Sequence, residues 1–160
     1  MKKAIVIGNG DLFQKPQIEE KAYIVAVDGG YKYIKQYRIK TDLVLGDFDS
    51  EDKKRVICKN IITLPVHKDD TDTSYAINYL IEKGYDEFEL YGMLGGNRFE
   101  HSLANIQVLA KIGKLGLNGK IYSSDLSYYL QIISGPRNIE IKRKSGTPFS
   151  LFAYTEKVQG

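Results

Sequence analysis

The sequence contains little cysteine, little proline and no long apolar run, and each scarcity excludes a class of protein. Its single cysteine, Cys58, cannot form an intramolecular disulfide and lacks the spacing of a zinc site. Four prolines among 160 residues, with 42% hydrophobic and 27% charged residues, are typical of a globular domain. The apolar run at residues 4–7 is too short for a signal peptide, and none approaches a membrane span. We therefore expect a cytoplasmic protein with no membrane partner.

The charge balance argues against a nucleic-acid partner. Lysine and arginine number 23 against 20 acidic residues, a net charge of +3, and the two signs are mixed along the chain. A nucleic-acid footprint needs a basic stripe, which this pattern lacks. The length suits one domain, or one domain and part of another.

Short apolar runs alternate with helical patterns through the first two thirds of the chain. Strands are expected at residues 3–7, 22–27, 43–46, 61–64 and 86–91, and helices at 30–37, 51–58, 73–83 and 100–112. The first strands lack polar alternation, which is typical of parallel strands buried on both faces. Alternating strands and helices predict an α/β domain with right-handed crossovers.

The pattern changes after Gly113, where a glycine-rich stretch resembles a linker. Strands are expected at residues 120–124, 128–133, 138–142 and 148–154, separated by turn signals. The fold class is thus α/β: an N-terminal parallel-sheet three-layer domain over residues 1–116, followed by the start of an antiparallel β-sandwich domain over 117–160. Four short strands with open edges make a poor independent core, so we expect this second domain to be unfinished. Whether Gly160 is the natural C-terminus is left open.

Two carboxylates follow the buried run at residues 43–46. In extended backbone, Asp47 and Asp49 would share one face while Phe48 turns into the core. Mg²⁺ is usually held by one or two carboxylates and leaves its other positions to water and phosphates. A lone pair of this kind also fits a turn and a helix cap. A second acidic cluster, at residues 68–73, favours the metal interpretation.

Glycine and acid follow nearly every expected strand: Gly8-Asn9-Gly10, Asp28-Gly29-Gly30, Gly46-Asp47-Phe48-Asp49 and residues 92–96. In open α/β sheets, ligands bind beyond the carboxyl ends of the strands. Glycines allow phosphate to approach the backbone closely, and carboxylates beside phosphate need a cation. Together they predict a nucleotide site with magnesium. Neither a dinucleotide fingerprint nor a P-loop motif occurs.

Four blocks resemble, in order and spacing, the motifs of the thiamine pyrophosphokinase family. They are Asp28-Gly29-Gly30, Asp42-Leu43 with Gly46-Asp47-Phe48-Asp49-Ser50, Lys68-Asp69-x-Thr71-Asp72, and Gly95-Gly96-x-Arg98-x-Glu100-His101-x-Leu103-Ala104-Asn105. The resemblance spans most of the chain. It implies Mg²⁺-dependent transfer of diphosphate from ATP to thiamine, giving thiamine diphosphate and AMP. It also implies a homodimer that holds thiamine between domains of its two subunits.

The same resemblance implies roles for single residues. The metal ligands would be Asp47, Asp49 and Asp72, and the catalytic set adds Arg98 and Glu100. The nucleotide-binding residues would be Asp28, Gly29, Gly30, Lys68, Asp69, Thr71, Gly95, Gly96, His101 and Asn105. A carboxylate, Asp72 or Glu100, would accept the proton of the thiamine hydroxyl.

Departures from the family pattern leave alternatives open. The family usually has GGRxDH, whereas this chain inserts Asn97 before Arg98 and has Glu100 in place of aspartate. The serine-containing thiamine-binding segment expected after Gly160 is missing from the sequence. The alternatives are a non-catalytic nucleotide-binding module or inactive fragment, and a pterin pyrophosphokinase-like enzyme. Locally, Thr71 or Asp72 would also serve as a helix cap, and His101 as a half-buried structural residue.

Overall fold

A computed structural model describes residues 1–48, 56–65, 70–135, 140 and 145–154. These residues form a seven-stranded sheet in the order β4-β3-β2-β1-β5-β6-β7. The strands are β1 (Lys3–Ile7), β2 (Tyr23–Val27), β3 (Leu43–Gly46), β4 (Ile61–Thr63), β5 (Glu87–Tyr91), β6 (Asn118–Tyr122) and β7 (Tyr129–Leu130). The helices are η1 (Asp28–Gly30), α1 (Tyr31–Tyr37), α2 (Asp72–Glu82) and α3 (Phe99–Lys114). All strand pairs are parallel except β6 with β7.

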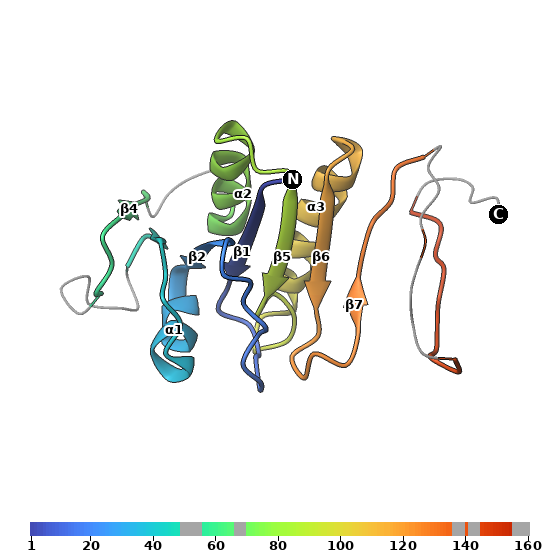
Figure 1. Cartoon of the computed structure of the whole chain (residues 1–160), viewed down its shortest axis with the longest axis horizontal. Helices are drawn as coiled ribbons and strands as arrows, with labels where there is room; N and C mark the ends of the chain where they lie inside the picture. Colours follow the sequence, from blue (N-terminus) through green and yellow to red (C-terminus); the bar gives the residue numbers. More distant parts are fainter. Residues whose placement is uncertain (49–55, 66–69, 136–139, 141–144, 155–160) are drawn as a thin grey trace.

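Helices cover both faces of the sheet (Figure 1). Because side chains alternate along a strand, Val6 of β1 points to one face and Ile5 to the other. Val6 shares an apolar cluster with Ile77 of α2 and Leu109 of α3, whereas Ile5 shares one with Ile34 of α1. The predicted three-layer α/β arrangement is confirmed. No described helix has the length and apolar character needed to cross a membrane.

Most element bounds agree with the expected ones. The strands at 3–7 and 43–46 are confirmed as predicted, and β2, β4 and β5 differ by one residue at one end. Helix α2 begins one residue earlier than expected, at Asp72. The helix expected at 51–58 falls mostly outside the described residues, and residues 56–58 are not helical.

The parallel sheet continues beyond residue 116. Strand β6 pairs in parallel with β5, and β7 adds an antiparallel edge. The strand expected at 148–154 is wrong, because residues 145–154 form no strand; in Figure 1 they lie beyond the edge strand β7. The strand expected at 138–142 lies almost wholly outside the described residues. The division into two domains at 116 and the β-sandwich therefore stay predictions.

The loops that follow β1, β2, β3 and β5 pack together at the carboxyl edge of the sheet. Gly10 N–H donates to the Gly92 carbonyl over 2.7 Å. A Cβ at Gly30 would lie 2.1 Å from the Ile7 carbonyl oxygen, so this position excludes any side chain. A Cβ at Gly46 would lie 3.1 Å from the Cα of Asp28. Close packing of the loops is therefore one physical reason for the glycines at this edge.

Candidate functional site

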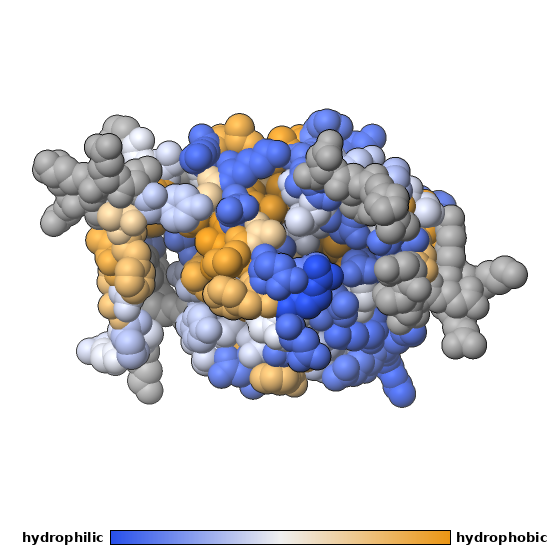
Figure 2. All heavy atoms as spheres, turned by 180° about the vertical axis from the view of Figure 1, so that it is seen from behind, coloured by the Kyte–Doolittle hydropathy of each residue, from blue (hydrophilic) through white to orange (hydrophobic). Residues whose placement is uncertain are grey.

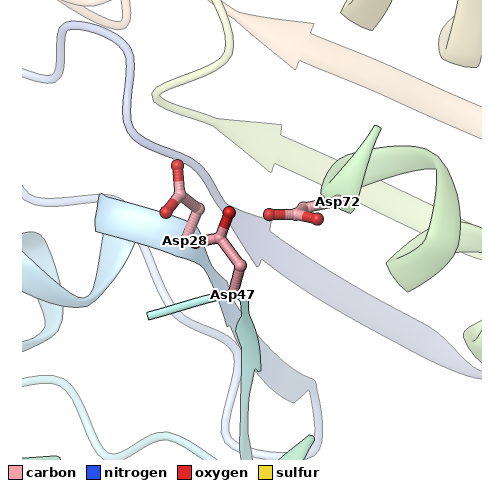
Figure 3. A group of neighbouring side chains, drawn as sticks. All are labelled: Asp28, Asp47 and Asp72. Carbon is pink, nitrogen blue, oxygen red and sulfur yellow. The ribbon is translucent and has the colours of Figure 1, made fainter. Parts of the chain in front are cut away.

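Three carboxylates meet at the carboxyl edge of the sheet. Asp28, Asp47 and Asp72 each bring one oxygen to within 4.8 Å of the others, and all three residues are half-buried. Asp28 follows β2, Asp47 follows β3, and Asp72 lies in the first turn of α2. Figure 3 shows the three side chains converging from these separate elements. We call this group the acidic site.

Unusual backbone angles place two residues of this region. Asp28 has a φ of 51° and Phe48 a φ of 59°, two of four left-handed non-glycine residues in the described part of the chain. This conformation is uncommon for residues with a side chain, and such strain collects at functional sites. The expected packing of Phe48 against the core is confirmed. The expected extended backbone is wrong, because the chain turns at Phe48 once β3 has ended; Asp49 lies outside the described residues.

The N-terminus of α2 places Asp72. The side chain of Thr71 accepts a hydrogen bond from Ser74 N–H over 3.1 Å, and the Asp70 carboxylate accepts one from the Ser74 hydroxyl over 2.7 Å. Thr71 is therefore the N-cap, as the helix-cap interpretation expected. Asp72 follows in the first turn, where the helix dipole favours negative charge.

The donor set suits a hard divalent cation. Three ionised carboxylates this close repel one another, and a bound cation would offset that repulsion. Carboxylate oxygens are also the ligands that Mg²⁺ prefers. Compared with the predicted ligands, Asp28 joins Asp47 and Asp72. The signal in the sequence was its position, since Asp28 directly follows an apolar run, as Asp47 does.

The predicted block at Arg98 opens α3. Arg98 Nε donates to the Glu100 carboxylate over 2.8 Å, and this hydrogen bond lowers the pKa of Glu100. Both side chains are exposed, and so is His101, so the half-buried interpretation of His101 is wrong. Asn105 is buried, and its side-chain amide donates to the Met93 carbonyl over 2.8 Å. Asn105 thus supports the loop before α3.

The glycine pair in this block has acceptors within the chain. Gly95 N–H donates to the Ser102 hydroxyl over 3.1 Å, and Gly96 N–H donates to the Asp11 carboxylate over 2.8 Å. Phosphate would have to displace these acceptors to bind the same amides. Asp11 and Ser102 were missing from the predicted site, because only the folded loops bring them to Gly95 and Gly96.

The remaining predicted residues divide into two groups. Gly29 and Gly30 are buried. A Cβ at Gly29 would lie 2.5 Å from the Asn9 side chain, so Gly29 packs against the loop after β1, and Gly30 packs against Ile7 at the end of β1. Lys68 and Asp69 lie outside the described residues.

The mostly parallel sheet defines an α/β protein, and the acidic site lies at the carboxyl edge of the sheet, where open sheets of this class bind ligands. Residues 15–121 match the family described as thiamin pyrophosphokinase, catalytic domain. The chain belongs to this family, which confirms the resemblance inferred from its motifs.

Relatives of known sequence or structure agree with this assignment. The chain is 31% identical over 139 residues to the thiamine pyrophosphokinase of Bacillus subtilis, covering 84% of this chain and 63% of that protein. A crystal structure of thiamine pyrophosphokinase from Bacillus subtilis matches with a TM-score of 0.64 and 26% identity, over 75% of this chain and 60% of that one. The crystal structure of a thiamin pyrophosphokinase family protein from Enterococcus faecalis matches with a TM-score of 0.66 and 25% identity, over 77% of this chain and 62% of that one. The chain spans about three-fifths of the length of these relatives.

Proposed function

We propose that the chain transfers diphosphate from ATP to the hydroxyl of thiamine, giving thiamine diphosphate and AMP in a Mg²⁺-dependent reaction. The observation that carries this proposal is the acidic site, three carboxylates within 4.8 Å in a member of the thiamin pyrophosphokinase family. A purely structural domain has little use for three converging carboxylates, whereas polyphosphate chemistry needs a held cation. As an extension of the proposal, the protein would work as a cytoplasmic homodimer.

The reaction forms one bond to phosphorus, breaks one, and moves one proton. The thiamine oxygen bonds to the β-phosphorus of ATP, the bond from that phosphorus to the α,β-bridging oxygen breaks, and AMP leaves. The hydroxyl proton passes to a carboxylate, Asp72 or Glu100. Arg98 lowers the pKa of Glu100, which weakens it as a base. Catalysis of this kind depends mostly on alignment and charge neutralisation.

Two parts of the chain would supply that alignment. Asp28, Asp47 and Asp72 would hold Mg²⁺, which supplies positive charge to the polyphosphate. Arg98 would stabilise charge on the departing oxygen. Because the Arg98 and Glu100 side chains are 68% and 64% exposed, phosphate can replace Glu100 as the partner of Arg98 at little cost.

The proposal is tested by measuring AMP and thiamine diphosphate formed from ATP, Mg²⁺ and thiamine, with the full chain and with Asp47→Asn. The variant keeps the side-chain size but loses the charge, so turnover should fall by about 100-fold or more. Asp86→Asn is the matched control, because Asp86 accepts the Lys2 N–H at the opposite edge of the sheet. Absence of product from the unaltered chain would contradict the proposal, and Mg²⁺-dependent ATP binding in its place would support a non-catalytic nucleotide-binding module.

A further inference from the structure

We propose that Asp11 is a positioning residue, which sets the backbone of Arg98 by tying the loop after β1 to the loop after β5. This inference rests on the proposed function, in which Arg98 meets the phosphates. Asp11 lies outside the family blocks on which the resemblance depends. Its role is inferred from hydrogen bonds on both sides of it.

Asp11 holds the loop after β5 at two points. Its carboxylate accepts the Gly96 N–H over 2.8 Å, and its own N–H donates to the Leu94 carbonyl over 3.0 Å. A Cβ at Gly95 would lie 2.5 Å from the same carboxylate oxygen, so glycine at 95 makes room for Asp11. Gly95 and Gly96 have φ angles of 77° and 79°. Because consecutive glycines have many alternative conformations, this turn depends on its anchors.

Asp11 is itself supported from α1. The Tyr33 hydroxyl donates to the Gly10 carbonyl over 2.7 Å, and the Tyr37 hydroxyl donates to the Leu12 carbonyl over 3.0 Å. Both tyrosines lie on α1, and Tyr33 is buried in the apolar cluster below the loop. The residues on either side of Asp11 are therefore fixed to a rigid element.

Arg98 is separated from this anchor by one residue, Asn97, and stands immediately before α3. Ser102, in the first turns of α3, accepts the Gly95 N–H and so fixes the loop from the helix side. The backbone of Arg98 thus lies between two anchors, while its side chain remains 68% exposed.

A double-mutant cycle tests whether Asp11 acts through Arg98. Asp11→Ala should lower kcat about tenfold or more, with the KM for thiamine unchanged, because a displaced catalytic group costs turnover. Asp11→Asn keeps an acceptor oxygen and should restore most of the loss. In a chain that already carries Arg98→Ala, Asp11→Ala should lower kcat little further. An equal loss of kcat from Asp11→Ala with and without Arg98→Ala would overturn the proposal.

Amide hydrogen exchange supplies a readout that does not depend on turnover. Asp11→Ala should speed hydrogen exchange at the Gly96 amide. Asp86→Ala removes a carboxylate that accepts the Lys2 N–H, and it should leave the exchange rate of the Gly96 amide unchanged. Unchanged exchange in Asp11→Ala would overturn the anchoring role. If the unaltered chain forms no product, the proposed function fails, and the exchange rates alone decide whether Asp11 holds this loop.

Discussion

At the scale of single residues, the carboxylate of Asp28 combines charge with backbone strain. Its φ of 51° lies in the left-handed region, where aspartate and asparagine are more frequent than other residues with a side chain. Asparagine at this position keeps the conformational tolerance and removes the charge, whereas alanine also costs about 1 kcal/mol of backbone strain. Asp28→Asn is therefore the cleaner probe of metal binding.

Thr71 provides a test of the local structure that presents Asp72. Thr71→Ala removes the acceptor of the Ser74 N–H, so the free energy of unfolding should fall by about 1 kcal/mol. Thr71→Ser keeps the hydroxyl, so the free energy of unfolding of this variant should remain close to that of the unaltered chain. Urea denaturation measures both, and an alanine variant as stable as the serine variant would contradict the capping role.

Part of the acidic site was predicted from the sequence. Spacing put Asp47 just after a recognisable buried strand, whereas Asp72, at the start of a recognisable helix, was expected as a metal ligand from the family resemblance. The contribution of Asp28 depends on β2 lying beside β3, a neighbour relation that spacing does not encode. The turn at Phe48 was missed because the extended backbone was assumed to continue beyond the strand.

At the scale of elements, a polar cluster joins β1, β5 and β6. The Tyr91 and Tyr122 rings stack at 4.6 Å, the Tyr91 hydroxyl donates to Glu89 over 3.0 Å, and Lys3 pairs with Glu89 at 3.3 Å. Burial, and then the charge of Glu89, raise the pKa of both tyrosines, that of Tyr122 to about 12. The folded chain thus keeps protons that the unfolded chain releases.

This cluster predicts a loss of stability at alkaline pH. Between the ordinary tyrosine pKa of about 10 and the raised value of about 12, the unfolded state binds fewer protons, so the free energy of unfolding falls as pH rises. Below pH 10 the contribution is fully present. Tyr122→Phe should show a shallower decline when urea denaturation is repeated from pH 9 to 12. An equally steep decline in the variant would show that Tyr122 does not contribute to the loss of stability at alkaline pH.

The packing of η1 against β1 predicts a large effect of one methyl group. Gly30→Ala places a Cβ 2.1 Å from the Ile7 carbonyl oxygen, so we expect a loss of about 3 kcal/mol or more in the free energy of unfolding. Gly84→Ala is the matched comparison, because a Cβ at this position would meet nothing within 4 Å. Its only cost is the strain of a left-handed residue with φ of 78°, about 1–2 kcal/mol. Thermal unfolding measures both variants, and an equal loss of stability in Gly30→Ala and Gly84→Ala would contradict the packing role of Gly30.

The alternation of strands and helices predicted the parallel sheet, but not its continuation into β6 beyond residue 116. Glycines at 113, 116 and 119 resembled a linker in the sequence. In the structure Gly116 follows α3 with a φ of 73°, and a Cβ at Gly119 would lie 2.9 Å from Ile112 of α3. Gly119 allows β6 to pack closely under α3, and a glycine needed for contact cannot be distinguished from a linker glycine by spacing.

At the scale of the whole molecule, the stretch at residues 149–152 exposes apolar side chains. Phe149, Leu151 and Phe152 are 69%, 61% and 83% exposed, and the stretch is apolar in the space-filling view from behind (Figure 2). Contiguous exposed apolar surface is typical of a covered interface. The surface is compatible with the homodimer expected from the family resemblance.

Light scattering of the full chain tests that expectation. A homodimer should scatter with twice the chain mass of 18.1 kDa, and Phe149→Ser with Phe152→Ser should shift the mass toward 18.1 kDa at low concentration. The paired substitutions remove apolar area without touching the acidic site. A mass of 18.1 kDa for the unaltered chain at every concentration would contradict the dimer.

The acidic site is tested most directly by titrating the chain with Mn²⁺ and following free Mn²⁺ by electron paramagnetic resonance. The unaltered chain should bind Mn²⁺ and release it when Mg²⁺ is added. Asp28→Asn, Asp47→Asn and Asp72→Asn should each weaken binding about tenfold or more, and Asp86→Asn should not. Affinity that is the same in all five proteins, or no binding to the unaltered chain, would contradict a cation site formed by these three carboxylates.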